Sequence, residues 1–359
     1  MKNVIWGACA WAVFLCLGAG ALLAQENRAI GVVKIRPPDA PGGQEIQLYK
    51  GSHALVIGVS DYEDLQGKGW PDLPGVRKDV EAVKAALEKH EFNVTVAMDP
   101  NSEALRKAFQ DFIDKRGLDP QNRLLFYFAG HGHTLKKSWG GDMGYIVPAD
   151  APNPNRDRDG FLTKALDMQQ IEVYAKRIES KHALFLFDCC FSGSLFDMTR
   201  AVPDVISWKT TKPVRQFVTA GQADETVPDR SIFREQFVDG IAGQADVDKD
   251  GYVTCTELGE FLQKTVLNYS KQTQHPQYGK IRDKNLDQGD FVFQVPLPGT
   301  TPPGPWKPAV TPDAAARPAA TATPAPVAGE SDPLVEEEYS RIIQEAKEIL
   351  DRYEESLKK

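Results

Sequence analysis

The sequence predicts a three-layer α/β fold in which a mostly parallel central sheet carries helices on both faces. Two observations lead to this prediction. Between residues 53 and 295, short apolar runs alternate with segments whose apolar residues recur three or four positions apart. Such alternation of strands and helices is typical of a parallel sheet. The apolar runs also lack the polar alternation of half-buried strands, so both faces of the sheet should be covered.

Seven elements can be placed in order along the first part of this region. The expected strands cover residues 53–59, 93–97, 123–129 and 183–187, and the expected helices cover 76–92, 103–113 and 168–178. The first helix has its apolar residues at helical spacing, at Val76, Val80, Val83, Ala86 and Leu87. The second helix should direct Leu105, Phe109 and Phe112 into the core.

Composition places the chain among ordinary globular proteins. It has 359 residues, of which 42% are hydrophobic and 26% are charged, so a sizeable core can form. The formal net charge is -8, and no cluster of lysine and arginine stands out. A nucleic-acid partner is therefore not expected.

Residues 1–24 have the pattern of a secretory signal peptide. Lys2 precedes an apolar run that ends at Ala24, just before the polar Gln25. A basic start, an apolar centre and a polar boundary mark such a signal. We therefore expect a secreted or periplasmic protein, with residues 25–52 as an N-terminal lead-in. The run is nearly long enough to cross a membrane, so an uncleaved N-terminal membrane anchor is the alternative.

Two further segments follow the expected α/β domain of residues 53–295. Residues 296–333 hold eleven of the 25 prolines, mixed with alanine and threonine, and show no hydrophobic periodicity. Such a composition is typical of an extended linker. Residues 334–359 are charged and amphipathic, which predicts a helix. That helix could pair with a copy of itself, dock on a partner or fold back.

Two short motifs begin where expected strands end. His131 lies between Gly130 and Gly132, after the third strand, and Cys190 follows the fourth strand. Because reactive groups gather beyond the carboxyl ends of such strands, the two side chains should meet in space. A free thiol has a pKa of about 8.5, and an imidazole that accepts its proton makes it a strong nucleophile. The backbone N–H groups of Gly132 and Cys190 could then hold the developing oxyanion.

The residues around this pair resemble those of a known family. The stretch Tyr127-Phe-Ala-Gly-His-Gly-His133 resembles the histidine motif of the caspase-like clan. The stretch Asp188-Cys-Cys-Phe-Ser-Gly193 resembles the cysteine motif of the same clan, and both are most similar to its metacaspase and paracaspase branch. A stretch characteristic of paracaspases is similar to Val147-Pro-Ala-Asp-Ala-Pro-Asn-Pro154. The resemblance runs from about residue 53 to residue 295, with the order of elements intact.

The resemblance implies a caspase-like fold and a peptidase of family C14 with a Cys/His dyad. Carried over, the third residue of the cysteine motif is the nucleophile, so Cys190 attacks and His131 is its base. Cys189, whose side chain should point away from that of Cys190, is then a packing residue. The chain departs from the metacaspase pattern at Cys189, where a small residue is common, and at Phe191, where a histidine is common. Neither position belongs to the dyad.

An acidic residue, Asp188, stands two positions before the nucleophile. Animal caspases hold a neutral glutamine there, in a pocket for an acidic substrate side chain. A carboxylate would repel an acid and attract a guanidinium or ammonium group. By the same resemblance, Asp79 and Asp224 match positions that line the first specificity pocket of paracaspases, which implies cleavage after Arg or Lys. The alternative is that Asp79 caps its helix and Asp224 belongs to a turn.

Residues 246–257 fit the twelve-residue EF-hand calcium loop at every position. Gly251 occupies the sharp turn, and apolar residues at helical spacing flank the loop on both sides. The expected ligands are the side chains of Asp246, Asp248 and Asp250, the carbonyl of Tyr252, Thr254 through water, and both carboxylate oxygens of Glu257. EF-hands usually pair and this chain has one, so the alternative is an Asp/Gly-rich turn without metal. No organic cofactor is expected.

The sequence therefore predicts a cysteine endopeptidase that hydrolyses peptide or protein substrates after Arg or Lys, with calcium as an assisting ion. The alternative belongs to a different functional class. It is a non-proteolytic interaction or scaffold protein with a caspase fold, which presents the tethered helix of residues 334–359. The intact dyad and the acidic pocket favour the enzyme.

Overall fold

The computed structural model describes residues 33–35, 46–190, 196–197, 211–222, 225 and 231–295. The chain divides into two compact units, Met1–Thr301 and Pro302–Lys359, and the described residues all belong to the first. The expected signal peptide, proline-rich linker and C-terminal helix lie outside the described residues. No helix in the described ranges is long and apolar enough to cross a membrane.

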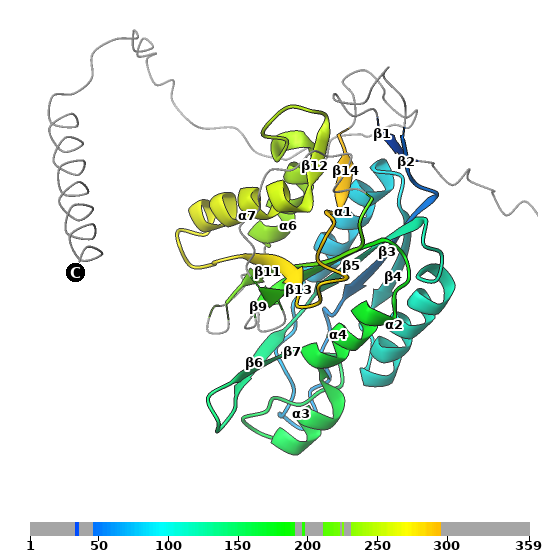
Figure 1. The fold of residues 1–359 in the computed structure, drawn as a ribbon. Coiled ribbons are helices and arrows are strands. Elements are labelled where there is room, and N and C mark those ends of the chain that lie inside the picture. Colours follow the sequence, from blue (N-terminus) through cyan, green and yellow to red (C-terminus); the bar gives the residue numbers. More distant parts are fainter. Residues whose placement is uncertain are drawn as a thin grey trace, which may run out of the picture. The chain divides into compact units, whose positions relative to one another are not determined.

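The centre of the fold is a seven-stranded sheet with the strand order β10-β13-β11-β9-β5-β3-β4 (Figure 1). The strands are β3 (Gly51–Gly58), β4 (Asn93–Met98), β5 (Asn122–Ala129), β9 (His182–Cys190), β10 (Phe196–Asp197), β11 (Val214–Gly221) and β13 (Gln277–Ile281). Five of them, β4, β3, β5, β9 and β11, run parallel, whereas β13 is antiparallel to both of its neighbours. Every residue of β3 and β5 is buried, as expected of strands covered on both faces.

Helices cover both faces of this sheet, which confirms the predicted three-layer α/β fold (Figure 1). One face carries α1 (Val76–Lys89), α6 (Ile232–Asp239) and α7 (Cys255–Tyr269), and the other carries α2 (Ser102–Arg116) and α4 (Met168–Arg177). The strand pleat divides the core between them. In β5, Phe126 stacks on Phe109 of α2 and belongs to the cluster that includes α4, while Leu125 and Tyr127 belong to the cluster on the opposite face.

Shorter elements surround the central sheet. They are β1 (Val33–Ile35) and β2 (Ile46–Tyr49), the small sheet of β6 (Gly132–Lys136), β7 (Asp142–Ile146) and β8 (Leu166–Asp167), helix α3 (Arg158–Lys164), the π-helical turn η2 (Gly240–Gln244), and the pair β12 (Tyr252–Thr254) and β14 (Val292–Gln294). The small sheet begins at Gly132, directly after the predicted catalytic histidine.

The predicted elements occur in the structure with shifted ends. The first helix ends at Lys89, three residues before its predicted end at residue 92. The reason is local, because Glu91 adopts a positive φ of 62°, a left-handed conformation that an α-helix cannot accommodate. The second helix is longer than predicted and runs from Ser102 to Arg116. Asn101 caps it by accepting a hydrogen bond from Ala104 N.

Candidate active site

The strand register brings the predicted dyad residues to one edge of the sheet. Ala129, the last residue of β5, is paired in parallel with Asp188 of β9. His131 and Cys190 each lie two residues further along these neighbouring strands, at their carboxyl ends. Cys190 is also paired with Gly221 at the end of β11. The backbone positions therefore agree with the predicted pair, while the Cys190 side chain lies outside the described part of the structure.

Hydrogen bonding fixes the orientation and the tautomer of His131. Its Nε2 lies 2.8 Å from the carbonyl oxygen of Pro71. Because a carbonyl oxygen can only accept, Nε2 must carry a proton. In the neutral imidazole, Nδ1 is then the basic nitrogen. The ring contacts the side chains of Tyr62 and Trp70, with ring centroids 4.9 and 5.0 Å away.

The surroundings of His131 favour its neutral form. Burial lowers the pKa of this imidazole, and the hydrogen bond with Pro71 opposes the shift to a smaller extent. A neutral imidazole near pH 7 is what a general base requires. The backbone is held as well, because His131 N donates to the Tyr62 hydroxyl at 2.8 Å. A Cβ atom at Gly130 would lie 2.9 Å from that hydroxyl, so the glycine permits this close approach.

The ladder between β6 and β7 leaves the predicted oxyanion donor unused. Val147 N donates to His131 O at 3.0 Å, and Gly132 is the register partner of Ile146. In an antiparallel ladder, this arrangement makes Gly132 and Ile146 a non-hydrogen-bonded pair. The N–H group of Gly132 therefore points away from β7.

The neighbouring cysteine has a different environment. Cys189 is 1% exposed and belongs to the aromatic cluster that contains Phe126, Phe185 and Phe187. Its thiol is thus enclosed in the core beneath α2 and α4, on the opposite side of the sheet from α6. Such burial agrees with its interpretation as a packing residue.

Asp188 has one satisfied and one unsatisfied carboxylate oxygen. It is 3% exposed, and its Oδ2 accepts hydrogen bonds from the hydroxyls of Tyr127 and Ser231, both at 2.6 Å. Its Oδ1 is buried without a hydrogen-bond partner among the described residues. Burial raises the pKa of Asp188 to about 6; the two hydroxyls lower it, and the nearby Asp79 carboxylate raises it. A buried acceptor without a partner is costly, and a cationic ligand would satisfy it.

A second predicted pocket residue, Asp79, lies beside Asp188. It is in the first turn of α1 and is 3% exposed. Its Oδ1 accepts a hydrogen bond of 2.8 Å from Nε of Arg234, which comes from α6. The structure thus brings together two of the three predicted pocket carboxylates in a buried acidic slot, by which we mean Asp79 and Asp188. The third, Asp224, lies outside the described residues.

The backbone of the predicted calcium loop turns sharply near its centre. Lys249 and Gly251 both have positive φ, at 61° and 86°. Gly251 N donates to Asp246 Oδ2 at 3.1 Å, which closes the loop on its first residue. One oxygen from each of Asp246, Asp248 and Asp250 lies within 4.8 Å of the others. Asp246 Oδ1 is buried and lacks a partner among the described residues.

The remaining predicted ligands have structural contacts. Thr254 caps α7 and forms a capping box with Glu257, whose Oε2 accepts from Thr254 N at 2.9 Å. Glu257 is not part of the carboxylate group formed by the three aspartates. Tyr252 begins β12, which pairs with β14 at the register Val253–Phe293. Strand β14 therefore supports one side of the loop through this pairing.

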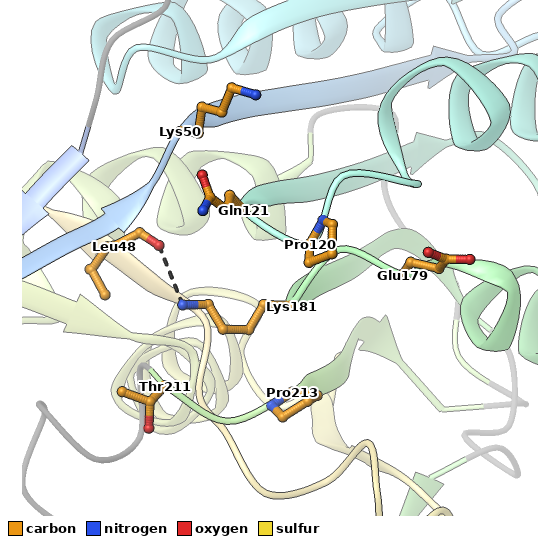
Figure 2. A pocket seen from close by; sticks show the side chains of 8 residues that line it. All are labelled: Leu48, Lys50, Pro120, Gln121, Glu179, Lys181, Thr211 and Pro213. Carbon is orange, nitrogen blue, oxygen red and sulfur yellow. Dashed lines mark hydrogen bonds between the residues drawn. The ribbon is translucent and has the colours of Figure 1, made fainter.

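A cavity of about 520 Å³ lies elsewhere in the fold (Figure 2). Its lining residues directly precede the central strands, since Lys50, Gln121, Lys181 and Pro213 stand just before β3, β5, β9 and β11. The cavity is thus at the amino ends of these strands, opposite the edge that holds His131. Leu48, Pro120, Glu179 and Thr211 complete the lining. This cavity is not part of the candidate active site.

The sequence analysis assigned no role to six residues that the structure places in the site, namely Tyr62, Trp70, Pro71, Tyr127, Ser231 and Arg234. Ser231 carries a weak signal, because a serine before an apolar helical segment predicts a helix cap. It caps α6 by accepting from Arg234 N at 2.9 Å. Nothing in the sequence connects Arg234 with Asp79, which lies 155 positions earlier.

Comparison with known proteins identifies related chains. Residues 52–287 match the caspase domain of peptidase family C14. A metacaspase, "Metacaspase III c" of Phaeodactylum tricornutum, is 27% identical over 173 residues. That alignment covers 45% of this chain and 46% of the relative, so the chain spans less than half of the relative's length. A crystal structure of a Geobacter sulfurreducens protein matches with a TM-score of 0.43 at 15% identity, over 66% of this chain and 96% of that one.

Proposed function

This chain belongs to the caspase-domain family, and we propose that it is a cysteine endopeptidase that cleaves after Arg or Lys. The family match supports cysteine peptidase activity. The observation that carries the specificity is the buried Oδ1 of Asp188, which has no hydrogen-bond partner among the described residues. Asp188 is a buried carboxylate two residues before Cys190. A guanidinium or ammonium group of a substrate would give its Oδ1 a charge-assisted hydrogen bond. An acidic substrate side chain would instead meet two buried carboxylates, Asp188 and Asp79.

The proposed reaction uses His131 and Cys190 in two stages. Nδ1 of His131 takes the proton of the Cys190 thiol, and the thiolate attacks the carbonyl carbon of the scissile bond. The N–H groups of Gly132 and Cys190 hold the oxyanion of the tetrahedral intermediate. The intermediate collapses, the C–N bond breaks, and the leaving amine takes the proton from Nδ1. A water molecule, deprotonated by the same nitrogen, then hydrolyses the thioester and restores the thiol.

A peptide panel tests this function. The purified full chain is assayed on three fluorogenic peptides that differ only in the residue before the scissile bond: Arg, Lys or Asp. We expect cleavage of the Arg and Lys peptides, little cleavage of the Asp peptide, and no cleavage by Cys190→Ala. A preference for the Asp peptide would refute the specificity. Binding without cleavage of any peptide would favour the scaffold alternative.

The acidic slot should make cleavage depend on pH. With a pKa of about 6, Asp188 is charged above this pH and neutral below it. Attraction of a basic side chain is therefore present above about pH 6 and is lost as the pH falls through it. We expect kcat/KM for the Arg peptide to rise between about pH 5 and about pH 7, because this parameter reports ionisations of the free enzyme. The pH profile of Asp188→Asn is the control. The same rise of kcat/KM between about pH 5 and about pH 7 in that variant would show that Asp188 does not cause it.

We also propose that the loop of residues 246–257 binds calcium. Three aspartates contribute oxygens within 4.8 Å of one another, and Asp246 Oδ1 is buried without a partner in the described part of the chain. An oxygen-rich set of this kind suits Ca²⁺. The loop is also connected to the slot, because α6 begins beside Ser231, which contacts Asp188, and ends shortly before Asp246. Calcium would therefore support the helix that completes the slot.

Calcium should stabilise the folded chain. A ligand that binds only the folded form contributes about 1.4 kcal/mol at a tenfold excess over its dissociation constant. For a domain of this size, the melting temperature should rise by about 3–6 °C. The double variant Asp246→Asn, Glu257→Gln should lose this response, while Asp114→Asn, an exposed carboxylate paired with Arg177, should keep it. Calorimetric titration that finds no calcium binding to the parent chain would exclude the metal site.

A further inference from the structure

The buried acidic slot already contains a cation from the same chain. Arg234 Nε lies 2.8 Å from Asp79 Oδ1, and the side chains of these two residues are 18% and 5% exposed. The positive charge of Arg234 also lowers the pKa of the nearby Asp188 and so favours its ionised form. Both Arg234 and Ser231, which contacts Asp188, belong to the start of α6. One guanidinium group therefore faces the two carboxylates of the slot, and its Nη2 also lies 3.5 Å from Oε1 of Glu235.

We propose that Arg234 is a specificity-determining residue, whose guanidinium competes with the basic side chain of a substrate for Asp79. This inference rests on the proposed function. It adds that a residue of the chain itself competes with the substrate for the slot. The guanidinium of Arg234 is chemically the same group as an arginine side chain of a substrate, so both seek the same carboxylate oxygens. Two ligands of like charge also repel each other in a poorly solvated slot. A substrate arginine must therefore displace Arg234 from Asp79 or bind beside a like charge.

The charged and titratable groups around Asp79 and Asp188 limit what else can compete. Among the described residues, Tyr127 approaches from β5 and Ser231 and Arg234 approach from α6. The two hydroxyl groups are neutral donors and do not compete for a cation. Arg234 is thus a cation of the chain itself that holds an oxygen of the slot. Its removal should take away this competitor for the substrate.

The effect has a defined direction. When only a fraction of the molecules has a free slot, the apparent affinity for a ligand falls to that fraction of its intrinsic value. If Arg234 holds Asp79 about nine-tenths of the time, its removal should tighten binding of a basic ligand by about tenfold. A purely structural role predicts the opposite, because loss of a buried ion pair would weaken the site.

The test measures inhibition by a peptidyl-arginine aldehyde and steady-state cleavage of the Arg peptide, with the full chain. We expect Arg234→Gln to lower both the inhibition constant and KM about five- to tenfold, with kcat changed less than twofold. Arg234→Lys, which keeps the charge, should restore values near those of the parent. Arg177→Gln, which removes an arginine from an exposed ion pair with Asp114, is the matched control and should change neither.

The outcomes separate this inference from the proposed function. If the parent chain neither cleaves the Arg peptide nor binds the aldehyde, the proposed function fails. If the parent does both but Arg234→Gln binds the aldehyde equally or more weakly, only the role of Arg234 fails. Should the variant not fold, a crystal structure of the parent with the aldehyde decides. A ligand arginine on Asp79 with Arg234 displaced supports the inference, and an unbroken Arg234–Asp79 contact overturns it.

Discussion

Replacement of Cys190 by alanine is expected to abolish peptide hydrolysis, and His131→Ala is expected to lower kcat/KM by about 10²–10⁴-fold. Without the thiol, no acyl-enzyme can form. Without the imidazole, the thiol keeps most of its proton near pH 7, since its ordinary pKa is about 8.5. His131 is suited to the task because the Pro71 carbonyl leaves Nδ1 as its basic nitrogen. Initial rates on the Arg peptide measure both effects.

Matched variants distinguish catalysis from folding. Cys189→Ala removes the adjacent thiol, which lies in the core, and should cost about 1 kcal/mol of folding free energy while most activity remains. His133→Ala removes the imidazole two positions after His131 and should keep activity within about threefold, because this ring packs against Trp70 and Phe161. Normal turnover by folded Cys190→Ala protein would show that Cys190 is not the nucleophile.

Asp188→Asn is expected to remove most activity on basic substrates. The substitution keeps the shape of the side chain and its acceptor for the Tyr127 and Ser231 hydroxyls, but it removes the charge. Loss of one partner of a buried charged pair typically costs about 2–5 kcal/mol, which corresponds to roughly 30- to 4,000-fold in kcat/KM. The loss should be largest for the Arg and Lys peptides.

The control for Asp188→Asn is Asp114→Asn, which neutralises an exposed carboxylate and should leave kcat/KM unchanged. Melting temperatures show whether each variant is folded. The aspartate should be destabilised by its own burial, since burial raises its pKa to about 6. The asparagine variant should therefore be at least as stable as the parent near pH 7. Unchanged cleavage of the Arg peptide by folded Asp188→Asn would show that Asp188 does not bind the substrate side chain.

The sequence was sufficient to predict four of the five parallel strands and the positions of His131 and Cys190 along the chain at one edge of the sheet. Four apolar runs marked four of the parallel strands, and the rule for carboxyl ends placed His131 and Cys190 at one edge. Strand β11 had no such signal, because it buries Arg215 and Gln216. The structure shows how these polar side chains are tolerated. Arg215 Nε donates to the Ala175 carbonyl, and Gln216 Nε2 donates to Asp290.

The contacts inside the acidic slot could not have been predicted from the sequence. Asp79 and Arg234 are 155 positions apart, and Asp188 and Ser231 are 43 positions apart. These contacts depend on how α1 and α6 pack side by side on the sheet, which hydrophobic periodicity does not specify. The same holds for β14, a three-residue strand whose partner, β12, lies within the predicted calcium loop.

Affinity labelling most directly tests the central claim, which is that this chain is a cysteine peptidase specific for Arg and Lys. The full chain is treated separately with two irreversible peptidyl ketones that differ only in a terminal Arg or Asp, and the adduct is mapped by mass spectrometry of proteolytic fragments. The account predicts one adduct, on Cys190, formed much faster with the Arg reagent and abolished by His131→Ala. An adduct on Cys189 or Cys255, or faster labelling of Cys190 by the Asp reagent, would contradict it.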